Sequence, residues 1–348
     1  MTIIEKLHNL NIKGPVVVMP DFIIDRVIKL KSKQDLFDMI NNKKFGAGAI
    51  RGIQTYETKG GKAVNVAYCL AKLGINNVTL FTIADKLGLA ILEHYFSDFK
   101  RTVNFRIKNG KQGYNTAFEF LDDIQKVFLS DIGDNDKFGP SMIDGKDDIQ
   151  IISYAAAIIL MDWASNSLGT ELAEYVFKRS ANSLHFIDTG DITTRKSDIP
   201  KLLEVLANNK SILSINENEC NSFADIIKFE ALSTIQKEDD LKKGGVNIQE
   251  YLKKFAKKMK VSIDLHANRY TAWSDGKEVA LVPTRKVKIN NLVGAGDSWD
   301  AADIVGYLAG LDAKERLTFS NAYVSLYINN PNSEPASMSE VIDLLQKE

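Results

Sequence analysis

The chain has 348 residues, with 44 basic and 45 acidic side chains that leave a formal net charge of -1. No run of lysine or arginine is long enough to form a polyanion-binding tail, so the sequence argues against nucleic acid as a partner. Its two cysteines lack the spacing of a disulfide framework or zinc site, and its longest apolar run is far below the ~20 residues that cross a bilayer. We therefore expect a cytoplasmic protein that does not contact a membrane.

Short apolar segments recur along the chain between stretches with helical periodicity. In chain order they cover residues 16–19, 78–81, 155–161, 184–187, 211–215 and 261–263. Continuous apolar strands are typical of a sheet buried on both faces, because both sets of alternating side chains then face helices. The sequence therefore predicts an α/β fold, with one domain over residues 1–348 and a central, mainly parallel sheet flanked by helices on both faces.

Two regions interrupt this rhythm, at about residues 26–58 and 103–131. The first contains a glycine-rich stretch, and in the second apolar and polar residues alternate. Alternation with period two predicts strands with one wet face and one dry face. We expect the two regions to form a small, discontinuous β-sheet lid that covers a substrate cleft or a partner subunit. An exposed edge of such a lid favours a homodimer.

Polar side chains follow several of the apolar segments. In chain order they are Asp21, Asp25, Asp162, Asp188, Asp191, Asn216, Glu219, Asp264 and His266. Ligands of open parallel sheets bind at the carboxyl ends of the strands, where loops and helix starts meet. Each acid taken alone is equally well explained as a helix cap. Together they predict a polar crevice that needs cations, hydroxyls or a metal to satisfy it.

A first glycine motif, Gly60-Gly61, opens a helical segment. Adjacent glycines let a small ligand approach the backbone, and Asn65, one turn later, offers an amide donor and acceptor. The alternative is a tight turn followed by a solvent-facing asparagine. Lys62 in this loop and Arg51 in the lid segment would bind a phosphate group carried by a bound small molecule. The alternative is that both are simply exposed cations.

A second glycine motif, Gly294-Ala295-Gly296, stands directly before Asp297 at the start of another helical segment. The first amides of a helix have no intrahelical partner and the helix dipole is positive there, so anions bind at such a place. The motif therefore predicts an anion hole beside a bound phosphate. Asp297 would be either a helix cap or a general base.

Together these motifs resemble the paired signatures of the ribokinase-like (PfkB) carbohydrate kinases. The resemblance rests on Gly60-Gly61 with Asn65, on the segment that ends at Asp297, and on Asn216 with Glu219, in family order from about residue 15 to about residue 330. It implies a phosphotransferase that moves the terminal phosphoryl group of ATP or ADP to a hydroxyl of a small sugar, sugar phosphate or nucleoside.

The resemblance also implies a role for each site residue. Asp297 would be the base, and the amides of Gly294, Ala295 and Gly296 would form the anion hole. Glu219 and Asn216 would organise Mg²⁺ through water, which magnesium tends to retain. The acceptor would be held by Asp21, Asp25, Gly60, Gly61, Lys62, Asn65 and Asp162, and the nucleotide by Asn216, His266, Gly294 and Gly296.

Finer similarities, among them Asp188-Thr189-Gly190-Asp191, resemble an archaeal branch of the family that includes kinases of ribose 1-phosphate and of nucleosides, some of which use ADP. Two segments depart from the family pattern. Residues 291–293 stand where the family has an Asp-Thr pair, and Asp264-Leu265-His266 replaces a Thr-x-Gly element that lies beside the nucleotide. The phosphate donor therefore stays open between ATP and ADP.

Two other functions stay open. One is a catalytically silent sugar or nucleoside sensor on a kinase scaffold, although binding alone needs no base such as Asp297. The other is a nicotinamide-dependent oxidoreductase, which would require a Gly-x-Gly-x-x-Gly fingerprint after an early strand. The sequence that follows residues 16–19 offers no such fingerprint.

Overall fold

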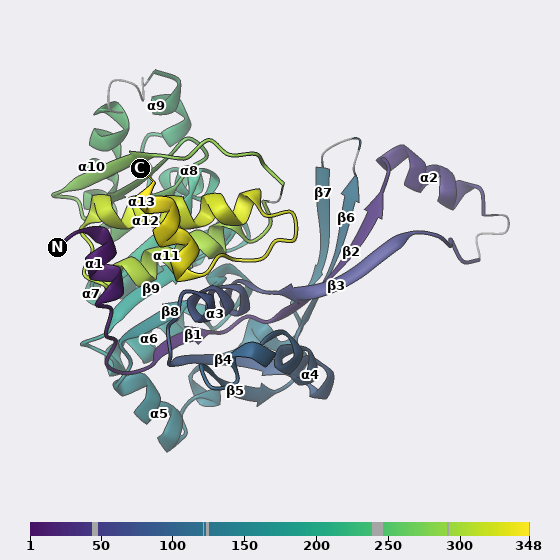
Figure 1. Cartoon of the computed structure of the whole chain (residues 1–348), viewed down its shortest axis with the longest axis horizontal. Helices are drawn as coiled ribbons and strands as arrows, with labels where there is room; N and C mark the ends of the chain where they lie inside the picture. The colour runs from purple at the N-terminus through teal and green to yellow at the C-terminus, as the bar shows by residue number, and fades with distance from the viewer. Residues whose placement is uncertain (44–47, 121, 123–124, 239–245, 291, 348) are drawn as a thin grey trace.

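A computed structural model describes residues 1–43, 48–120, 122, 125–238, 246–290 and 292–347. Nine strands form a central sheet in the order β13-β12-β11-β10-β9-β8-β1-β4-β5 (Figure 1). They are β1 Val16–Met19, β4 Val78–Ala84, β5 Val103–Asn109, β8 Ala157–Leu160, β9 Leu184–Asp188, β10 Ile212–Asn216, β11 Ser262–His266, β12 Tyr270–Ser274 and β13 Val279–Pro283. Neighbours from β5 to β11 are parallel, whereas β12 and β13 pair antiparallel at one edge. The predicted α/β fold with a mainly parallel sheet is confirmed.

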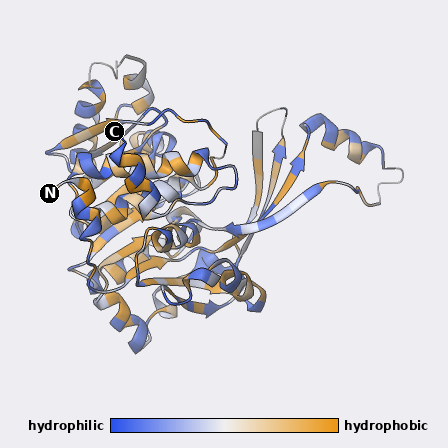
Figure 2. Cartoon of the chain, viewed as in Figure 1, coloured by the Kyte–Doolittle hydropathy of each residue, from blue (hydrophilic) through white to orange (hydrophobic). Residues whose placement is uncertain are grey.

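Helices cover both faces of this sheet. Successive side chains of a strand point to opposite faces, so Val17 and Met19 of β1 join one apolar core and Val16 and Val18 join the other. The first core contains side chains of α5 Lys146–Ser153, α6 Gly169–Arg179, α7 Ile199–Asn208, α8 Glu217–Ile226, α9 Leu232–Glu238 and α10 Val246–Met259. The second contains side chains of α1 Ile3–His8, α3 Lys62–Lys72, α4 Lys86–Tyr95, α11 Ala295–Leu308, α12 Ala313–Asn329 and α13 Met338–Gln346. Figure 2 shows the resulting pattern of hydrophobic strands beneath helices with hydrophilic outer faces.

The lid is a second sheet that projects from the body (Figure 1). Its strand order is β3-β2-β6-β7. The strands are β2 Ile23–Leu30, β3 Gln54–Gly60, β6 Gly113–Phe120 and β7 Gln125–Asp131. Between β2 and β3 lies α2 Lys33–Asn41, a helix that the sequence did not predict, which Ser32 caps by accepting a hydrogen bond from the Asp35 N–H. Residues 44–47, 121 and 123–124 of the predicted lid lie outside the described residues.

One part of the lid prediction was wrong. Residues 103–109 were assigned to the lid, but they form β5, which pairs in parallel with β4 over seven residues of the central sheet. β5 is the last strand in that sheet and only its first residue is fully buried. An edge strand of this kind alternates between polar and apolar residues just as a lid strand does, so period two could not separate them.

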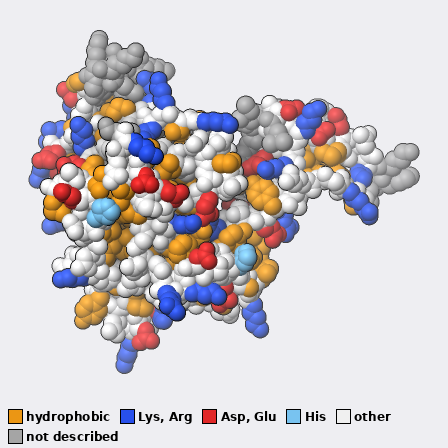
Figure 3. Space-filling model, viewed as in Figure 1, with side chains coloured by type: hydrophobic (Ala, Val, Ile, Leu, Met, Phe, Trp, Pro, Cys, Tyr) orange, Lys and Arg blue, Asp and Glu red, His pale blue; other side chains and the backbone are white. Residues whose placement is uncertain are grey.

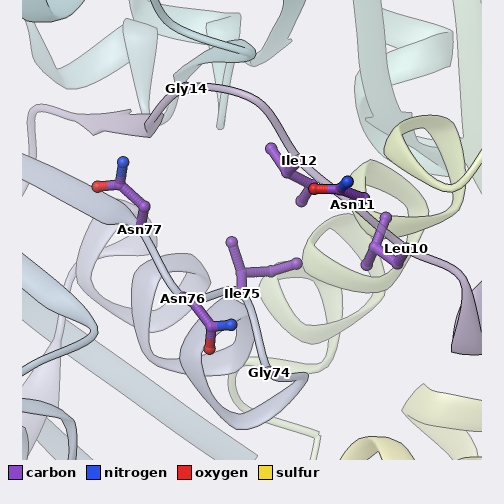
Figure 4. Close-up of a pocket in the computed structure, with 8 residues that line it drawn as sticks. All are labelled: Leu10, Asn11, Ile12, Gly14, Gly74, Ile75, Asn76 and Asn77. Atoms are coloured by element: carbon purple, nitrogen blue, oxygen red, sulfur yellow. The ribbon is translucent and has the colours of Figure 1, made fainter.

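The carboxyl ends of β1, β8, β9, β10 and β11 share one edge of the central sheet, because these strands are parallel. Most of the predicted polar residues lie at this edge. A surface pocket of about 150 Å³ lies instead at the opposite edge, where residues 74–77 lead into β4 and meet residues 10–14 (Figure 4). The three asparagines and apolar side chains of that pocket belong to none of the predicted motifs.

Charges are mixed on the surface. Figure 3 shows acidic and basic side chains interspersed over the visible face, as the near-zero net charge leads one to expect. Within the described residues, none of the helices combines the length and the apolar character that crossing a membrane requires.

Candidate active site

Asp297 lies near the start of α11, where the two glycine motifs meet. Gly294 precedes this helix with a φ of 79°, a left-handed conformation that glycine adopts without steric cost. The Asp297 side chain is 7% exposed, and its Oδ2 accepts a hydrogen bond from Asn65 Nδ2 at 2.8 Å. Asn65 belongs to α3, so this bond joins two residues that are 232 positions apart in the sequence.

The surroundings of Asp297 weaken it as an acid. Burial raises the pKa of its carboxyl to about 6, against the opposing effects of the Lys62 ammonium and the Asn65 hydrogen bond. Asp188 and Asp162 raise this pKa further. A carboxylate with such a pKa is mostly ionised at pH 7 and accepts a proton more readily than an ordinary aspartate does.

Asp21 holds the start of α3. It is 2% exposed and accepts hydrogen bonds from the backbone N–H groups of Lys62 at 2.5 Å and Ala63 at 2.9 Å. The first N–H groups of a helix have no intrahelical partner, so Asp21 acts as the cap of α3 from the end of β1. Burial, with the nearby Asp162, raises the pKa of Asp21 well above its ordinary value.

Gly61 stands between Asp21 and the first turn of α3. Its φ is 88°, and a Cβ there would lie 2.8 Å from the backbone oxygen of Asp21 and 3.0 Å from the backbone nitrogen of Ile23. These are main-chain atoms, which cannot rotate away as a side chain can. The loop therefore needs glycine both for its backbone conformation and for its close contact with β1 and β2.

Replacing Gly61 with alanine should lower the free energy of unfolding by about 1–3 kcal/mol from backbone strain alone, and further through the clash with Asp21. Gly74 is the matched control, because its φ is 84° but nothing lies within 4 Å of a Cβ built there. Urea unfolding of the two variants separates strain from crowding. Equal losses for Gly61→Ala and Gly74→Ala would contradict a crowded loop.

Asp25 lies at the base of the lid, on β2. Asn115 of β6 donates a hydrogen bond from Nδ2 to Asp25 Oδ1 at 2.8 Å. A Cβ on Gly60 would come within 2.5 Å of the Asp25 carboxyl carbon, so the missing side chain is what lets this carboxylate lie against the glycine loop. The lid and the start of α3 therefore meet at Asp25 and Gly60.

Lys62 forms an ion pair with Asp188 at the end of β9. Its Nζ lies 2.9 Å from Asp188 Oδ1 and 2.8 Å from Oδ2, and Asp188 is 1% exposed. Burial lowers the pKa of Lys62, but Asp188 and the other acids outweigh it and the net shift is well upward. Lys62 is thus a charged partner inside an acidic site, whereas Arg51 of the lid is exposed.

Asp162 follows β8 and lies near two other buried acids, Asp21 and Asp188. Its φ of 52° is unusual for a residue with a side chain. A Cβ on Gly190 would lie 2.6 Å from Asp162 Oδ1, so the loop after β9 packs directly on this carboxyl. Burial raises the pKa of Asp162, and the Lys62 ammonium partly offsets that rise.

Asn216 and Glu219 form a capping box at the start of α8. Asn216 Oδ1 accepts hydrogen bonds from the N–H groups of Asn218 and Glu219 at 2.9 and 3.0 Å, and Glu219 Oε2 accepts one from the Asn216 N–H at 2.9 Å. Glu219 is 7% exposed, and burial, followed by Asp188, raises its pKa to about 8. Because the Asn216 side-chain oxygen accepts hydrogen bonds from two N–H groups at the start of α8, Asn216 fixes the orientation of Glu219.

His266 ends β11 and packs against Trp299 of α11, with ring centroids 5.3 Å apart. Burial lowers the pKa of His266 to about 4, so its imidazole is neutral. The atom nearest to a Cβ built on Gly296 is His266 Cε1, at 3.5 Å. The structure thus places His266 beside the predicted anion hole.

Two acids near this site were not predicted as site residues. Asp188 was recognised at the rim but given no role, and Asp300 of α11 was not singled out. Asp300 is fully buried and accepts a hydrogen bond from Ser214 Oγ at 2.5 Å. The available signal was the spacing of Asp297, Asp300 and Asp303, which places three acids along one helical face of an otherwise apolar segment.

Asp264, predicted at the polar rim, lies elsewhere. It is fully buried and accepts hydrogen bonds from Arg316 at 3.2 Å and from the Tyr307 hydroxyl at 2.9 Å. Arg316 also pairs with Asp303. Asp264 and His266 are two positions apart in β11, so their side chains share one face of the sheet. Asp264 lies further from the carboxyl end of the strand than His266, and there it contacts Arg316 of α12 and Tyr307 of α11. Asp264 is part of a buried ion network.

Comparison with known proteins identifies the family. The model of the pfkB family of carbohydrate kinases matches residues 24–339. This chain belongs to the pfkB family of carbohydrate kinases. Membership implies phosphotransferase activity on a sugar or nucleoside, and it argues against the nicotinamide-dependent oxidoreductase. No curated protein sequence matches the chain.

Solved structures share the fold of this pfkB-family kinase at low sequence identity. Ribokinase from Thermotoga maritima is 18% identical with a TM-score of 0.72, covering 97% of this chain and all of its own. Arabidopsis thaliana ribokinase, solved with ribose and ATP, is 20% identical with a TM-score of 0.71, covering 97% and 99%. A nucleoside kinase from Methanocaldococcus jannaschii, an archaeal member of the ribokinase family, is 15% identical with a TM-score of 0.65, covering 97% and 100%. The ribokinase-like fold is therefore confirmed.

The pfkB-family kinase brings most of its predicted site residues to one edge of the sheet. Three contacts hold these residues together. Asn65 donates a hydrogen bond to Asp297, Lys62 pairs with Asp188, and Asp21 accepts a hydrogen bond from the start of α3. Asn291, where the sequence departs from the family pattern, lies outside the described residues. Leu292 and Val293 are exposed and stand directly before Gly294.

Proposed function

We propose that this pfkB-family kinase transfers the terminal phosphoryl group of ATP or ADP to a hydroxyl of a small sugar, sugar phosphate or nucleoside. The hydrogen bond from Asn65 to Asp297 carries the proposal, because it unites the two glycine motifs in one site. The ribose and ATP named for the Arabidopsis ribokinase structure support a sugar acceptor and a nucleotide donor. The nucleoside kinase from Methanocaldococcus jannaschii makes a nucleoside the other acceptor class to test. A place in the archaeal branch is proposed from the sequence motifs alone.

The chemical step depends on Asp297 and the first turn of α11. The acceptor hydroxyl lies against the Asp297 carboxylate, which takes its proton as the new bond to phosphorus forms. The backbone N–H groups of Gly294, Ala295 and Gly296 stabilise the charge that develops on the phosphoryl oxygens. The positive end of the helix dipole adds to this stabilisation.

The acceptor binds between the lid and the start of α3. Asp25 accepts hydrogen bonds from its hydroxyls, and Asn65 donates hydrogen bonds to them. Gly60 and Gly61 leave room for the sugar beside the backbone. Asp21 keeps α3 in place through its two amide contacts. Asp162 and the ammonium of Lys62 complete the polar wall, and Lys62 gives a sugar phosphate a positive charge to approach.

The donor side fits a nucleotide with Mg²⁺. Glu219 fits the cation, because its carboxyl is buried and the Asn216 N–H is the one hydrogen-bond donor identified for it among the described residues. A bound cation would stabilise the ionised form against the burial that raises this pKa to about 8. Asn216 holds Glu219 in place. Mg²⁺ bound here would neutralise charge on the phosphate oxygens, and Glu219 would hold it through water. His266, beside Gly296, is positioned to contact the phosphates or base.

The lid excludes water from the site. Water competes with the acceptor hydroxyl for the phosphoryl group, so closure favours transfer over hydrolysis. The lid reaches the site through Asp25 on β2 and Gly60 at the end of β3, which connects directly to α3. Movement of these two strands would therefore reposition acceptor-binding groups.

The direct test is nucleotide consumption by the purified chain with a panel of pentoses, hexoses, nucleosides and ribose 1-phosphate. Each acceptor is offered with ATP and with ADP in the presence of Mg²⁺, and products are identified by mass spectrometry. Acceptor-dependent formation of a phosphorylated product supports the kinase. Saturable acceptor binding without turnover by either nucleotide would favour the sensor instead.

The pH dependence of the reaction should report Asp297. Because the base acts in its ionised form and its pKa is raised to about 6 by burial, kcat/KM should rise as the pH increases through 6 and level off above it. The charged groups that act on it are Lys62, Asp188 and Asp162. A pH-rate profile between 5 and 8, with circular dichroism to confirm folding, measures the shift. A profile that is flat down to pH 5 would show that the base is not a buried aspartate.

We also propose that the lid forms a homodimer. Val127 and Leu129 of β7 are 44% and 61% exposed, and Val127 lies opposite Phe118 on the same face of the lid sheet. Water-exposed apolar side chains in a row mark an interface. Light scattering should show a dimer that Leu129→Lys converts to a monomer. Tyr154→Lys, which changes an exposed aromatic of the body, should leave the dimer intact.

A further inference from the structure

Three potential metal ligands converge beside the proposed phosphoryl-transfer site. Asp188 ends β9, His266 ends β11 and Asp300 lies one turn after Asp297 in α11. One ligand atom from each lies within 4.8 Å of the other two. β9 and β11 flank β10 in the central sheet and Asp300 comes from α11, so three separate elements supply this cluster.

Two atoms of this cluster have no hydrogen-bond partner among the described residues. They are His266 Nε2 and Asp300 Oδ2, both inaccessible to solvent, and Asp300 as a whole is fully buried. An unpartnered buried polar atom costs free energy. Burial, followed by the charge of Asp188, raises the pKa of Asp300 well above its ordinary value, so without a cation Asp300 keeps a proton that it can donate to Asp188. A bound cation would replace that proton and would also give His266 Nε2 the partner that it lacks among the described residues.

Neighbouring groups already orient the three side chains. Ser214 Oγ donates to Asp300 Oδ1 at 2.5 Å, and the Gly190 N–H donates to Asp188 Oδ1 at 2.7 Å. The His266 ring packs against Trp299. Supporting contacts of this kind are typical of metal sites, where outer partners hold the ligands in position.

Charge also favours a cation. Lys62 neutralises only one of the acids, by pairing with Asp188. Glu219, Asp297 and Asp300 lie close enough to Asp188 for its charge to act on each. A bound cation would reduce the excess of negative charge that Lys62 alone leaves in the cluster.

We propose that Asp188, His266 and Asp300 bind a divalent first-row transition metal, with Zn²⁺ as the probe, through direct bonds to the protein. The donor set decides the class of metal, because Mg²⁺ and Ca²⁺ take oxygen ligands whereas an imidazole nitrogen with two carboxylates suits Zn²⁺ and its neighbours. Three protein ligands leave a coordination position for water or a phosphate oxygen. The site is separate from Glu219, which serves Mg²⁺ in the proposed kinase.

Calorimetric titration of the full-length chain with ZnCl₂, in an excess of Mg²⁺ and without nucleotide or acceptor, tests the site. We expect one saturable site per chain that His266→Gln and Asp300→Asn each weaken by about tenfold or more. His94→Gln changes an exposed histidine of α4 and should not alter Zn²⁺ affinity.

Co²⁺ provides an independent readout, because its visible absorption reports bonds to nitrogen and oxygen ligands. A Co²⁺ spectrum that the His266→Gln variant loses while remaining folded by circular dichroism supports the site. The metal site would be overturned if Zn²⁺ showed no saturable binding, or if both ligand variants kept the affinity of the unchanged chain. Either result would indicate that Asp188 and Asp300 share a proton instead. These measurements do not depend on catalysis, so failure of the kinase proposal would leave their outcome unaffected.

Discussion

Replacing Asp297 with asparagine should lower kcat by about 10²–10⁴-fold, the range expected when a general base is lost. Asparagine keeps the size of the side chain and still offers an oxygen to Asn65 Nδ2. The dissociation constants of acceptor and nucleotide should therefore change little, so the loss would lie in the chemical step. Single-turnover phosphoryl transfer and equilibrium binding measure the two quantities separately.

Asp191 supplies the control for this substitution. It is an acid of the same rim, but it is exposed and caps a short helix by accepting a hydrogen bond from the Thr193 N–H. Asp191→Asn should retain nearly all activity. Full turnover by Asp297→Asn would place the base elsewhere, and an equal loss in both variants would point to general electrostatics of the rim.

Replacing Arg316 with leucine should lower the free energy of unfolding by about 3–5 kcal/mol, as expected when one partner of a buried ion network is removed. Arg316 is 1% exposed and pairs with Asp303 and Asp264, and its guanidinium lies 3.4 Å from the centre of the Tyr307 ring. Without it, two carboxyl groups remain buried with little compensation. Chemical denaturation measures the loss.

A surface ion pair provides the comparison for Arg316. Lys201 and Glu171 are 57% and 45% exposed and 2.7 Å apart, so Lys201→Ala should cost no more than about 1 kcal/mol. The double substitution Arg316→Leu with Asp303→Asn should be more stable than Arg316→Leu alone, because it removes one of the stranded charges. Similar costs for the Arg316 and Lys201 substitutions would show that the network contributes no more than a surface pair.

The Arg316 network also bears on the site. Asp303 lies two turns after Asp297 on α11, and Asp264 lies two residues before His266 on β11. Arg316 joins these two elements from α12. A loosened network would thus disturb the proposed anion hole and His266 together, and the activity of Arg316→Leu should fall with its stability.

The local sequence determined six of the nine strands of the central sheet, the two glycine motifs and most of the group of polar residues at the strand ends. Strand burial follows from periodicity, and helix starts follow from glycine and capping residues within a few positions. These signals act over short distances along the chain. For that reason the parallel sheet was predictable from the residues, whereas the approach of the first glycine motif to Asp297, seen in the Asn65–Asp297 hydrogen bond, was implied only by the resemblance to a family.

Tertiary structure alone decided which acid does what. Asp21 caps α3, and Asp264 belongs to the buried ion network of Arg316. Asp188 pairs with Lys62, which is 126 positions away in the sequence. It also decided that β5 joins the central sheet and that Asp300 faces Asp188 and His266. Each outcome depends on which distant segments pack together and exclude water, because burial sets both the pKa of an acid and its need for a partner.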